Sequence, residues 1–238
     1  MIRPILLCLL MTVPLAQAAA ADTVILLHGL ARSPLSLIRL EVALRSEGYS
    51  VQNLDYSSRS AEIAALAEST LGPVFAAAPT DGRRIHIVTH SLGGILVRQY
   101  LHDHGVPAAL GRVVMLAPPN EGSEVVDRMR DWKLFQLVNG PAGSELGTRA
   151  TDRPRALGPL PDGVEVGVIA GDRTFNPLMS QFLPGPNDGK VTVAATHLAG
   201  EAGHVTLHAS HTWIMWKGDA IGQVKTFLSE GRFAPSPI

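Results

Sequence analysis

Residues 89–93, Thr-His-Ser-Leu-Gly, put a serine where it could act as a nucleophile. They follow the apolar run 85–88 and precede a helical pattern at 95–100, so we expect Ser91 in a sharp turn between a strand and a helix. Such a turn exposes the hydroxyl and directs the next backbone N–H, that of Leu92, at the oxygen of a tetrahedral intermediate. Because a hydroxyl is a weak nucleophile at neutral pH, this chemistry also needs an imidazole base and a carboxylate that orients it.

Three histidines near the last predicted strand, 204–207, are candidates for the base: His204, His208 and His211. In a doubly wound sheet the partners of the serine lie on loops at the carboxyl ends of later strands. His211 fits such a loop, whereas His204 and His208 are expected inside the strand. Two carboxylates could be the acid, since Asp172 directly follows a predicted strand and Asp188 lies in a turn at 186–189. Both fit the chain order serine, acid, histidine.

Short β-rich runs alternate with helical patterns along the chain, which favours an α/β fold with a parallel sheet. The expected strands are 23–27, 50–54, 85–88, 113–116, 164–170 and 204–207, and the expected helices include 33–47, a helix with apolar positions from 63 to 75, one from about 95, and 219–228. Ser33 and Pro34 look like an N-cap followed by proline in the first turn, and Gly48 is expected to end that helix.

Residues 120–163 depart from this alternation, and we interpret them as a candidate lid or cap over the substrate site. Trp132 and Phe135 belong to an amphipathic stretch that either touches the acyl chain or is part of the core. In the first case the stretch could also contact a lipid interface transiently.

The N-terminus has the pattern of a cleaved secretory signal. Residues 5–15 are apolar, follow Arg3 and are too short to span a bilayer, while 16–20 supply small residues for a peptidase. We therefore expect a signal peptide at 1–20 and an exported domain at 21–238, periplasmic or secreted. The one cysteine, Cys8, lies in the signal, so the mature chain is expected to lack disulfides and a thiol nucleophile.

Composition narrows the class of protein. The chain of 238 residues is 46% hydrophobic, enough for a sizeable core in one domain. Its net charge of −1 has no concentrated basic run, so no nucleic-acid partner is expected. Carboxylate and cysteine partners at ligand spacing are not evident for the histidines at 86, 102, 104 and 197, so we predict no metal site. Catalysis by a serine with a histidine base needs no cofactor, so none is expected.

Four motifs together resemble the α/β-hydrolase superfamily, in particular its bacterial lipases and esterases. They are Val-Ile-Leu-Leu-His-Gly-Leu at 24–30, Val-Thr-His-Ser-Leu-Gly-Gly at 88–94, Leu-Ala-Pro-Pro-Asn-Glu-Gly-Ser at 116–123 and Asn-Asp-Gly-Lys-Val at 187–191. The resemblance spans most of the chain after residue 20. It implies a compact α/β-hydrolase with a mostly parallel central sheet flanked by helices, a small lid or cap insertion, and a sheet without the early antiparallel strands of larger members.

The resemblance also assigns roles. It gives the acid to Asp188, because the family acid lies in an Asn-Asp-Gly-x-Val turn, and it supports His211, which follows 23 residues later. It gives the oxyanion-stabilising N–H groups to Leu30 and Leu92. One residue departs from the pattern, since Thr89 stands where the family often has glycine. His28 and His90 flank the site and are expected mainly to pack and hydrogen-bond there.

The predicted function is hydrolysis of carboxylic esters, of small molecules or lipids, by Ser91, Asp188 and His211 through an acyl-enzyme. Two alternatives stay open. One is an acyltransferase that uses the same three residues, and the other is an exported binding protein on a hydrolase scaffold. The sequence does not indicate the oligomeric state.

Overall fold

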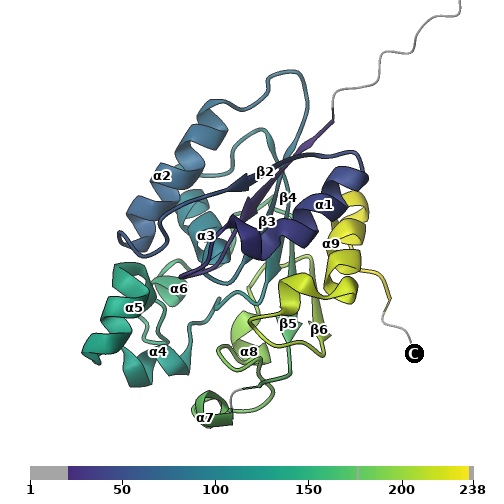
Figure 1. Ribbon diagram of the computed structural model, residues 1–238. Helices are drawn as coiled ribbons and strands as arrows, with labels where there is room; N and C mark the ends of the chain where they lie inside the picture. Colours follow the sequence, from purple (N-terminus) through teal and green to yellow (C-terminus); the bar gives the residue numbers. More distant parts are fainter. Residues whose placement is uncertain (1–20, 176, 236–238) are drawn as a thin grey trace, which may run out of the picture.

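A six-stranded parallel sheet forms the centre of the molecule (Figure 1). The computed structural model describes residues 21–175 and 177–235. The strands are β1 (Thr23–Leu27), β2 (Ser50–Leu54), β3 (Ile85–His90), β4 (Leu110–Leu116), β5 (Val166–Gly171) and β6 (Gly203–Leu207), in the order β2-β1-β3-β4-β5-β6. Every neighbouring pair runs parallel, so all six carboxyl ends lie at one edge.

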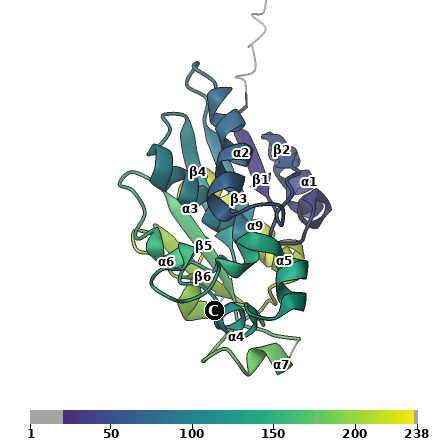
Figure 2. The same cartoon turned by 90° about the vertical axis from the view of Figure 1, so that its left-hand side faces the viewer.

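Helices cover both faces of the sheet (Figures 1 and 2). α1 (Ile38–Ser46) and α9 (Gly218–Glu230) pack on one face, and α2 (Ile63–Ala76) and α3 (Leu92–His104) pack on the other. Residues of β1 show why two layers are needed. Ile25 and Leu27 belong to the apolar cluster under α2 and α3, whereas Val24 and Leu26 belong to the cluster under α1 and α9. A strand buried on both faces reads as a continuous apolar run, as this one does.

The predicted fold class is confirmed, and the first two strands have the predicted bounds. The first helix differs from the prediction. It begins with a 3-10 turn, η1 (Pro34–Leu37), and the Ser33 side chain makes no capping hydrogen bond. Ser33 does occupy the predicted N-cap position, and the fixed backbone angle of Pro34 starts the helix without a hydrogen bond from the serine side chain. The predicted signal peptide and Cys8 lie outside the described residues.

The candidate lid, 120–163, contains the short helices α4 (Glu124–Met129), α5 (Lys133–Ser144) and α6 (Arg153–Ala156). Two arginines fasten it. Arg98 of α3 is buried and donates to the backbone carbonyls of Asn120, Pro154 and Gly158 at 2.7–2.8 Å. Arg130 pairs with Asp127 and Asp152 at 2.5 and 2.7 Å. Burial lowers the pKa of Arg98 to about 10, so its charge is still present at neutral pH.

The remaining elements are α7 (Pro177–Ser180) and α8 (Val193–Thr196), between β5 and β6, and η2 (Ile214–Trp216), before α9. Within the described part of the chain, none of these helices is long and apolar enough to span a membrane.

Candidate active site

Ser91 lies in the sharp turn between β3 and α3, as predicted, with φ 52° and ψ −119°. A positive φ is unfavourable for a residue with a Cβ, so the surrounding structure must hold it there. Part of that support is a hydrogen bond from the Ser91 amide to the Leu116 carbonyl at the end of β4, at 2.9 Å. The serine thus leaves the sheet at its carboxyl edge with its hydroxyl beside the neighbouring loops.

Thr89 fits this turn because it is still part of the strand. It pairs with Leu27 and Met115 on the two sides of β3 and is completely buried. The space it needs comes from Gly94, since a Cβ there would lie 3.3 Å from Thr89 Oγ1 and 3.2 Å from Met115 Sδ. The glycine that makes room in this elbow therefore follows the serine and does not precede it.

The structure brings Ser91, Asp188 and His211 together. His211 Nε2 lies 3.0 Å from Ser91 Oγ, and His211 Nδ1 lies 2.7 Å from Asp188 Oδ2. All three are buried, with exposed fractions of 8%, 2% and 4% in that order. This is the geometry in which an imidazole can take the serine proton while a carboxylate holds it in the required tautomer.

Backbone groups hold the acid in place. Asp188 Oδ1 accepts from the amides of Lys190 and Val191 at 2.9 and 2.8 Å, which leaves Oδ2 for the imidazole. The His211 amide donates to the Asp188 carbonyl at 3.0 Å, so the two loops are tied by backbone as well as by side chains. Lys190 in turn is tied to the lid segment, because its carbonyl accepts from the Ser123 hydroxyl at 2.6 Å.

The alternative acid and bases are engaged elsewhere. Asp172 Oδ1 lies 3.0 Å from His208 Nδ1, so these two candidates pair with each other at the surface. His204 Nε2 lies 2.9 Å from the Thr196 hydroxyl, and neither it nor the Asp172–His208 pair lines the cavity that contains Ser91.

The amides of Leu30 and Leu92 are the predicted oxyanion donors. Among the described residues neither amide has a hydrogen-bond acceptor. The loop after β1 also comes close to the nucleophile, since a Cβ on Gly29 would lie only 3.2 Å from Ser91 Cβ and 2.8 Å from His90 Nδ1. A residue with a side chain at position 29 would push this loop away from the serine.

Sequence reasoning missed the residues that brace this loop. The Tyr56 hydroxyl donates to the His28 carbonyl at 2.5 Å, and its ring stacks on the buried His28 ring at a centroid distance of 4.2 Å. The Ser58 hydroxyl accepts from the amide of Ala31, whose φ of 53° is also unfavourable. Both braces follow β2, and no sequence spacing relates them to the loop after β1.

His28 and His90 differ in position. His28 is buried beneath the loop and does not line the cavity, whereas His90 lies in the cavity wall. The His90 ring bonds to the His211 carbonyl at 2.9 Å, so it must donate through Nε2. Burial, and next the nearby His211, hold the pKa of His90 well below its usual value, which keeps the ring neutral.

A cavity of about 620 Å³ opens above these residues. One part of its wall is apolar and comes mainly from the candidate lid and from the loop after β1 that carries Leu30, the candidate oxyanion loop: Leu30, Val125, Val126, Met129, Phe135, Val138 and Leu146. Phe135 thus faces the cavity. Trp132 does not line it, and its side chain is largely exposed at the surface.

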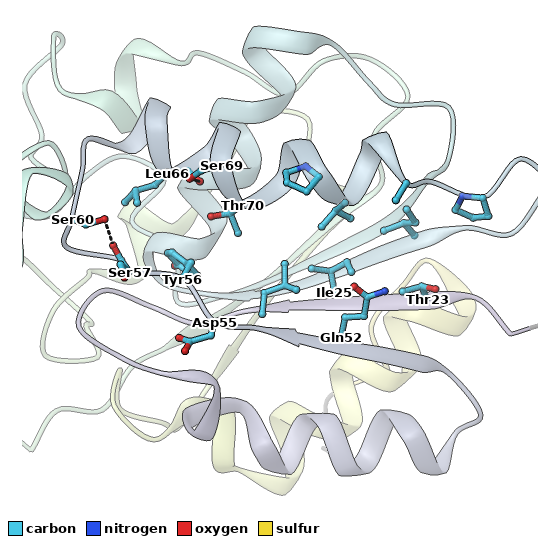
Figure 3. A pocket seen from close by; sticks show the side chains of 16 residues that line it. Thr23, Ile25, Gln52, Asp55, Tyr56, Ser57, Ser60, Leu66, Ser69 and Thr70 are labelled. Carbon is cyan, nitrogen blue, oxygen red and sulfur yellow. Dashed lines mark hydrogen bonds between the residues drawn. The ribbon is translucent and has the colours of Figure 1, made fainter.

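A second hollow, of about 560 Å³, lies between α2 and the edge strand β2 (Figure 3). Its labelled polar side chains include Gln52, Ser60, Ser69 and Thr70, with Asp55 near one end. It contains no histidine or cysteine, and none of its hydroxyls has an imidazole partner among the described residues.

One histidine cluster was not anticipated. Contrary to the prediction, the histidines at 86, 102, 104 and 197 all have carboxylate partners, namely Asp22, Asp103, Glu68 and Glu201, at 3.5, 2.9, 2.6 and 2.7 Å. The pair of His197 and Glu201 forms a cluster with His204, whose ring stacks on His197 at 3.8 Å between centroids. Ligand-type atoms of all three lie within 4.8 Å of one another. Burial, with His197 next in importance, lowers the pKa of His204 to about 4. The neutral ring can therefore stack on its neighbour and join α8 to β6.

The family follows from a comparison with known proteins. The model of the alpha/beta hydrolase fold family matches residues 22–155, which is more than half of the chain. The chain belongs to the α/β-hydrolase fold family. No curated protein matches the chain in a sequence comparison.

Solved structures of other α/β-hydrolases share the fold at low sequence identity. A lipase of Bacillus licheniformis in its mature form is 19% identical, with a TM-score of 0.66 over 89% of this chain and 92% of that one. A metagenomic carboxyl esterase is 21% identical, with a TM-score of 0.63 over 85% and 68%. An esterase of a Rhodococcus species is 16% identical, with a TM-score of 0.59 over 89% and 91%. At these identities the three structures show that the chain shares their fold.

Proposed function

We propose that this α/β-hydrolase cleaves carboxylic esters through a covalent acyl-enzyme on Ser91. The observation that carries the proposal is the continuous chain of hydrogen bonds from Ser91 Oγ through His211 to Asp188. A turn serine without catalytic duty would not require a buried imidazole and a buried carboxylate in line behind it. Burying those polar groups costs free energy that this chain of hydrogen bonds offsets.

The reaction has two halves. Ser91 Oγ attacks the carbonyl carbon while its proton passes to His211 Nε2, and the amides of Leu30 and Leu92 stabilise the resulting oxyanion. The C–O bond to the alcohol then breaks, and the alcohol leaves with the proton from His211. Water, deprotonated by the same imidazole, attacks the acyl-enzyme. The acyl bond to Ser91 Oγ then breaks, His211 returns the proton to Oγ, and the acid is released. Asp188 keeps Nδ1 protonated throughout and stabilises the imidazolium.

The acyl chain is proposed to occupy the apolar part of the cavity, against Val126, Phe135 and Leu146. In this proposal the candidate lid forms the wall that determines acyl-chain specificity, and the loops at the strand ends carry the catalytic residues. Small-molecule or lipid esters are the substrate class, and transient contact with a lipid interface remains part of the proposal because α5 exposes Leu134 and Leu137.

Titration with a p-nitrophenyl alkylphosphonate tests the proposal. Wild-type protein is expected to release one equivalent of p-nitrophenol and to gain the mass of the phosphonyl group on the peptide that contains Ser91. Ser91→Ala is expected to gain none. A protein that binds the phosphonate without a mass change would be a binding protein on a hydrolase scaffold. A separate assay with an ester substrate and an added alcohol tests for an acyltransferase. Transfer of the acyl group mainly to the alcohol, and not to water, would indicate that activity.

Export is a separate part of the proposal, supported by the pattern of residues 1–20. Expressed with its own N-terminus in a bacterium, the protein is expected outside the cytoplasm and to begin between residues 19 and 22. N-terminal sequencing of the purified protein measures this, and an intact Met1 on the soluble protein would contradict it.

A further inference from the structure

Two cations in the candidate active site have no partner. Arg32, in the loop after β1, and Lys190, in the loop that carries Asp188, line the same cavity as Ser91 and His211. Within the described residues neither side chain makes an ion pair or a hydrogen bond. Other arginines of the chain do, as Arg112 does with Glu165 at 2.6 Å and Arg130 with Asp152.

The cavity offers these cations no free carboxylate. Asp188 is the only acidic residue in its described wall, and both its oxygens are used, one by His211 and the other by two backbone amides. Desolvation, with Arg32 next in importance, lowers the pKa of the Lys190 amine, and the charge of Asp188 opposes this shift in part. Lys190 and Arg32 also contribute to the lowered pKa of His90. The positive charge of both side chains therefore reaches the catalytic end of the cavity.

Their backbones are fixed although their side chains are free. The Arg32 amide donates to the Gly29 carbonyl at 3.2 Å, and Lys190 is tied on both sides, to Asp188 and Ser123. Both side chains are exposed to solvent. A substrate can thus approach them directly, and an anion between them would relieve their mutual repulsion.

We propose that Arg32 and Lys190 form an anion subsite, so that the preferred substrate is an ester with an apolar acyl chain and an anionic group on its alcohol part. This proposal rests on the proposed ester hydrolysis and adds the substrate class. The acyl chain takes the apolar wall, which contains no charged residue, and the alcohol part remains near the two cations. The anionic group is a carboxylate or a phosphate, because guanidinium and ammonium groups bind both.

Matched ester pairs test the subsite and separate the two anions. The phosphate pair is 1-butanoylglycerol 3-phosphate against 1-butanoylglycerol, and the carboxylate pair is 4-(butanoyloxy)benzoate against 4-(butanoyloxy)benzamide. For each pair we measure the ratio of kcat/KM, anionic over neutral, at low ionic strength. We expect a ratio of about 100 in at least one pair, since each of two charge-assisted hydrogen bonds is worth about tenfold. If the anionic ester is preferred in only one pair, the anion of that pair, phosphate or carboxylate, is the one that the subsite binds.

Variants show whether the two cations cause the preference. Arg32→Gln and Lys190→Gln should each lower the ratio about tenfold, and the double variant should bring it near 1. Arg232→Gln removes an equal charge from an exposed arginine that pairs with Glu230 outside the cavity, and it should leave the ratio unchanged. Raising the salt concentration should lower the wild-type ratio. A wild-type ratio at or below 1 in both pairs, or a ratio that the double variant retains, would overturn the subsite.

Binding without turnover keeps this test independent of the proposed reaction. In Ser91→Ala, calorimetry is expected to give a lower Kd for the anionic ester than for its neutral partner, and adding the two glutamine substitutions should remove the difference. If wild type hydrolyses no ester, the proposed function fails while this binding result still decides the subsite. Equal Kd values for both esters would reject the subsite even if hydrolysis is found.

Discussion

The molecule has two hollows of similar volume, about 620 Å³ at the carboxyl ends of the strands and about 560 Å³ beside β2, and only one has converging chemistry. The first receives residues from the segments after β1, β3, β4, β5 and β6, which the parallel topology gathers at one edge. The second is a groove between one helix and one strand edge. Two of its serine hydroxyls bond locally, Ser60 to the Ser57 carbonyl at 2.8 Å and Ser69 to the Leu66 carbonyl at 3.3 Å (Figure 3). Convergence of separate strand ends, and not the size of a hollow, marks the candidate site.

The two hollows share a border. Tyr56 lines the groove, yet its hydroxyl braces the His28 carbonyl next to the oxyanion loop. Burial raises the pKa of Tyr56, so this hydroxyl stays protonated and remains a donor. The groove wall thus supports the neighbouring site without taking part in its chemistry. Substitutions of catalytic residues in the first hollow should therefore abolish turnover, whereas most substitutions in the groove should leave kcat near wild type.

The largest difference is expected between two serines. Ser91→Ala should lower kcat for a p-nitrophenyl ester by about 10⁶, because the nucleophile is lost. Ser69→Ala, in the groove, removes a hydroxyl that bonds only to its own helix and should leave kcat near wild type. Circular dichroism should show both variants folded. If Ser91→Ala kept more than a few per cent of wild-type activity, Ser91 would not be the nucleophile.

Two aspartates give the next largest difference. Asp188→Asn keeps the shape but favours the wrong imidazole tautomer, so kcat should fall by up to about 10⁴ with little change in Tm. Asp172→Asn should affect stability only, by about 1 kcal/mol or less, because its pair with His208 is exposed. Steady-state kinetics and thermal melts on both variants measure this. An inactive Asp172→Asn beside an active Asp188→Asn would reverse the assignment.

Tyr56→Phe tests the shared border. The ring can still stack on His28, but the His28 carbonyl loses its donor and the oxyanion loop loses a brace. We expect kcat to fall by about 10²-fold, the lower end of the effect of losing one oxyanion donor, while KM changes little. Tyr49→Phe, away from both hollows, is the matched control. Equal losses in kcat for the two variants would show a general effect of stability.

The smallest effect concerns the lid. Phe135 lines the active-site cavity and Trp132 does not, so Phe135→Ala should change the relative kcat/KM across acyl chain lengths by about tenfold. Trp132→Ala should change it little, since its ring is largely exposed. A series of p-nitrophenyl esters of rising acyl length measures both. A chain-length shift in Trp132→Ala alone would mean that the lid takes another arrangement when substrate binds.

Much of the architecture was predictable because its signals are local. The run at 23–27 reads as a buried strand, and the strand, turn and helix around Ser91 follow from apolar periodicity. Ser33 occupies the predicted N-cap position before Pro34, but its side chain makes no capping hydrogen bond, because a residue type favours a cap without ensuring that its side chain bonds there. The partner of His197 was missed because a carboxylate four residues away is near only if the chain turns back between them.

By itself the sequence determined the alternation of strands and helices, the serine turn and a short set of acids and bases in order. Only the tertiary structure decided which of these meet. It paired Asp172 with His208 at the surface and Asp188 with His211 beside Ser91, because distances between residues far apart in the chain depend on how the loops after β5 and β6 fold back. It also decided the groups with no sequence signature, namely the Tyr56 and Ser58 braces and the unpaired charges of Arg32 and Lys190. Those depend on what surrounds each side chain, and neighbours in space are fixed by packing.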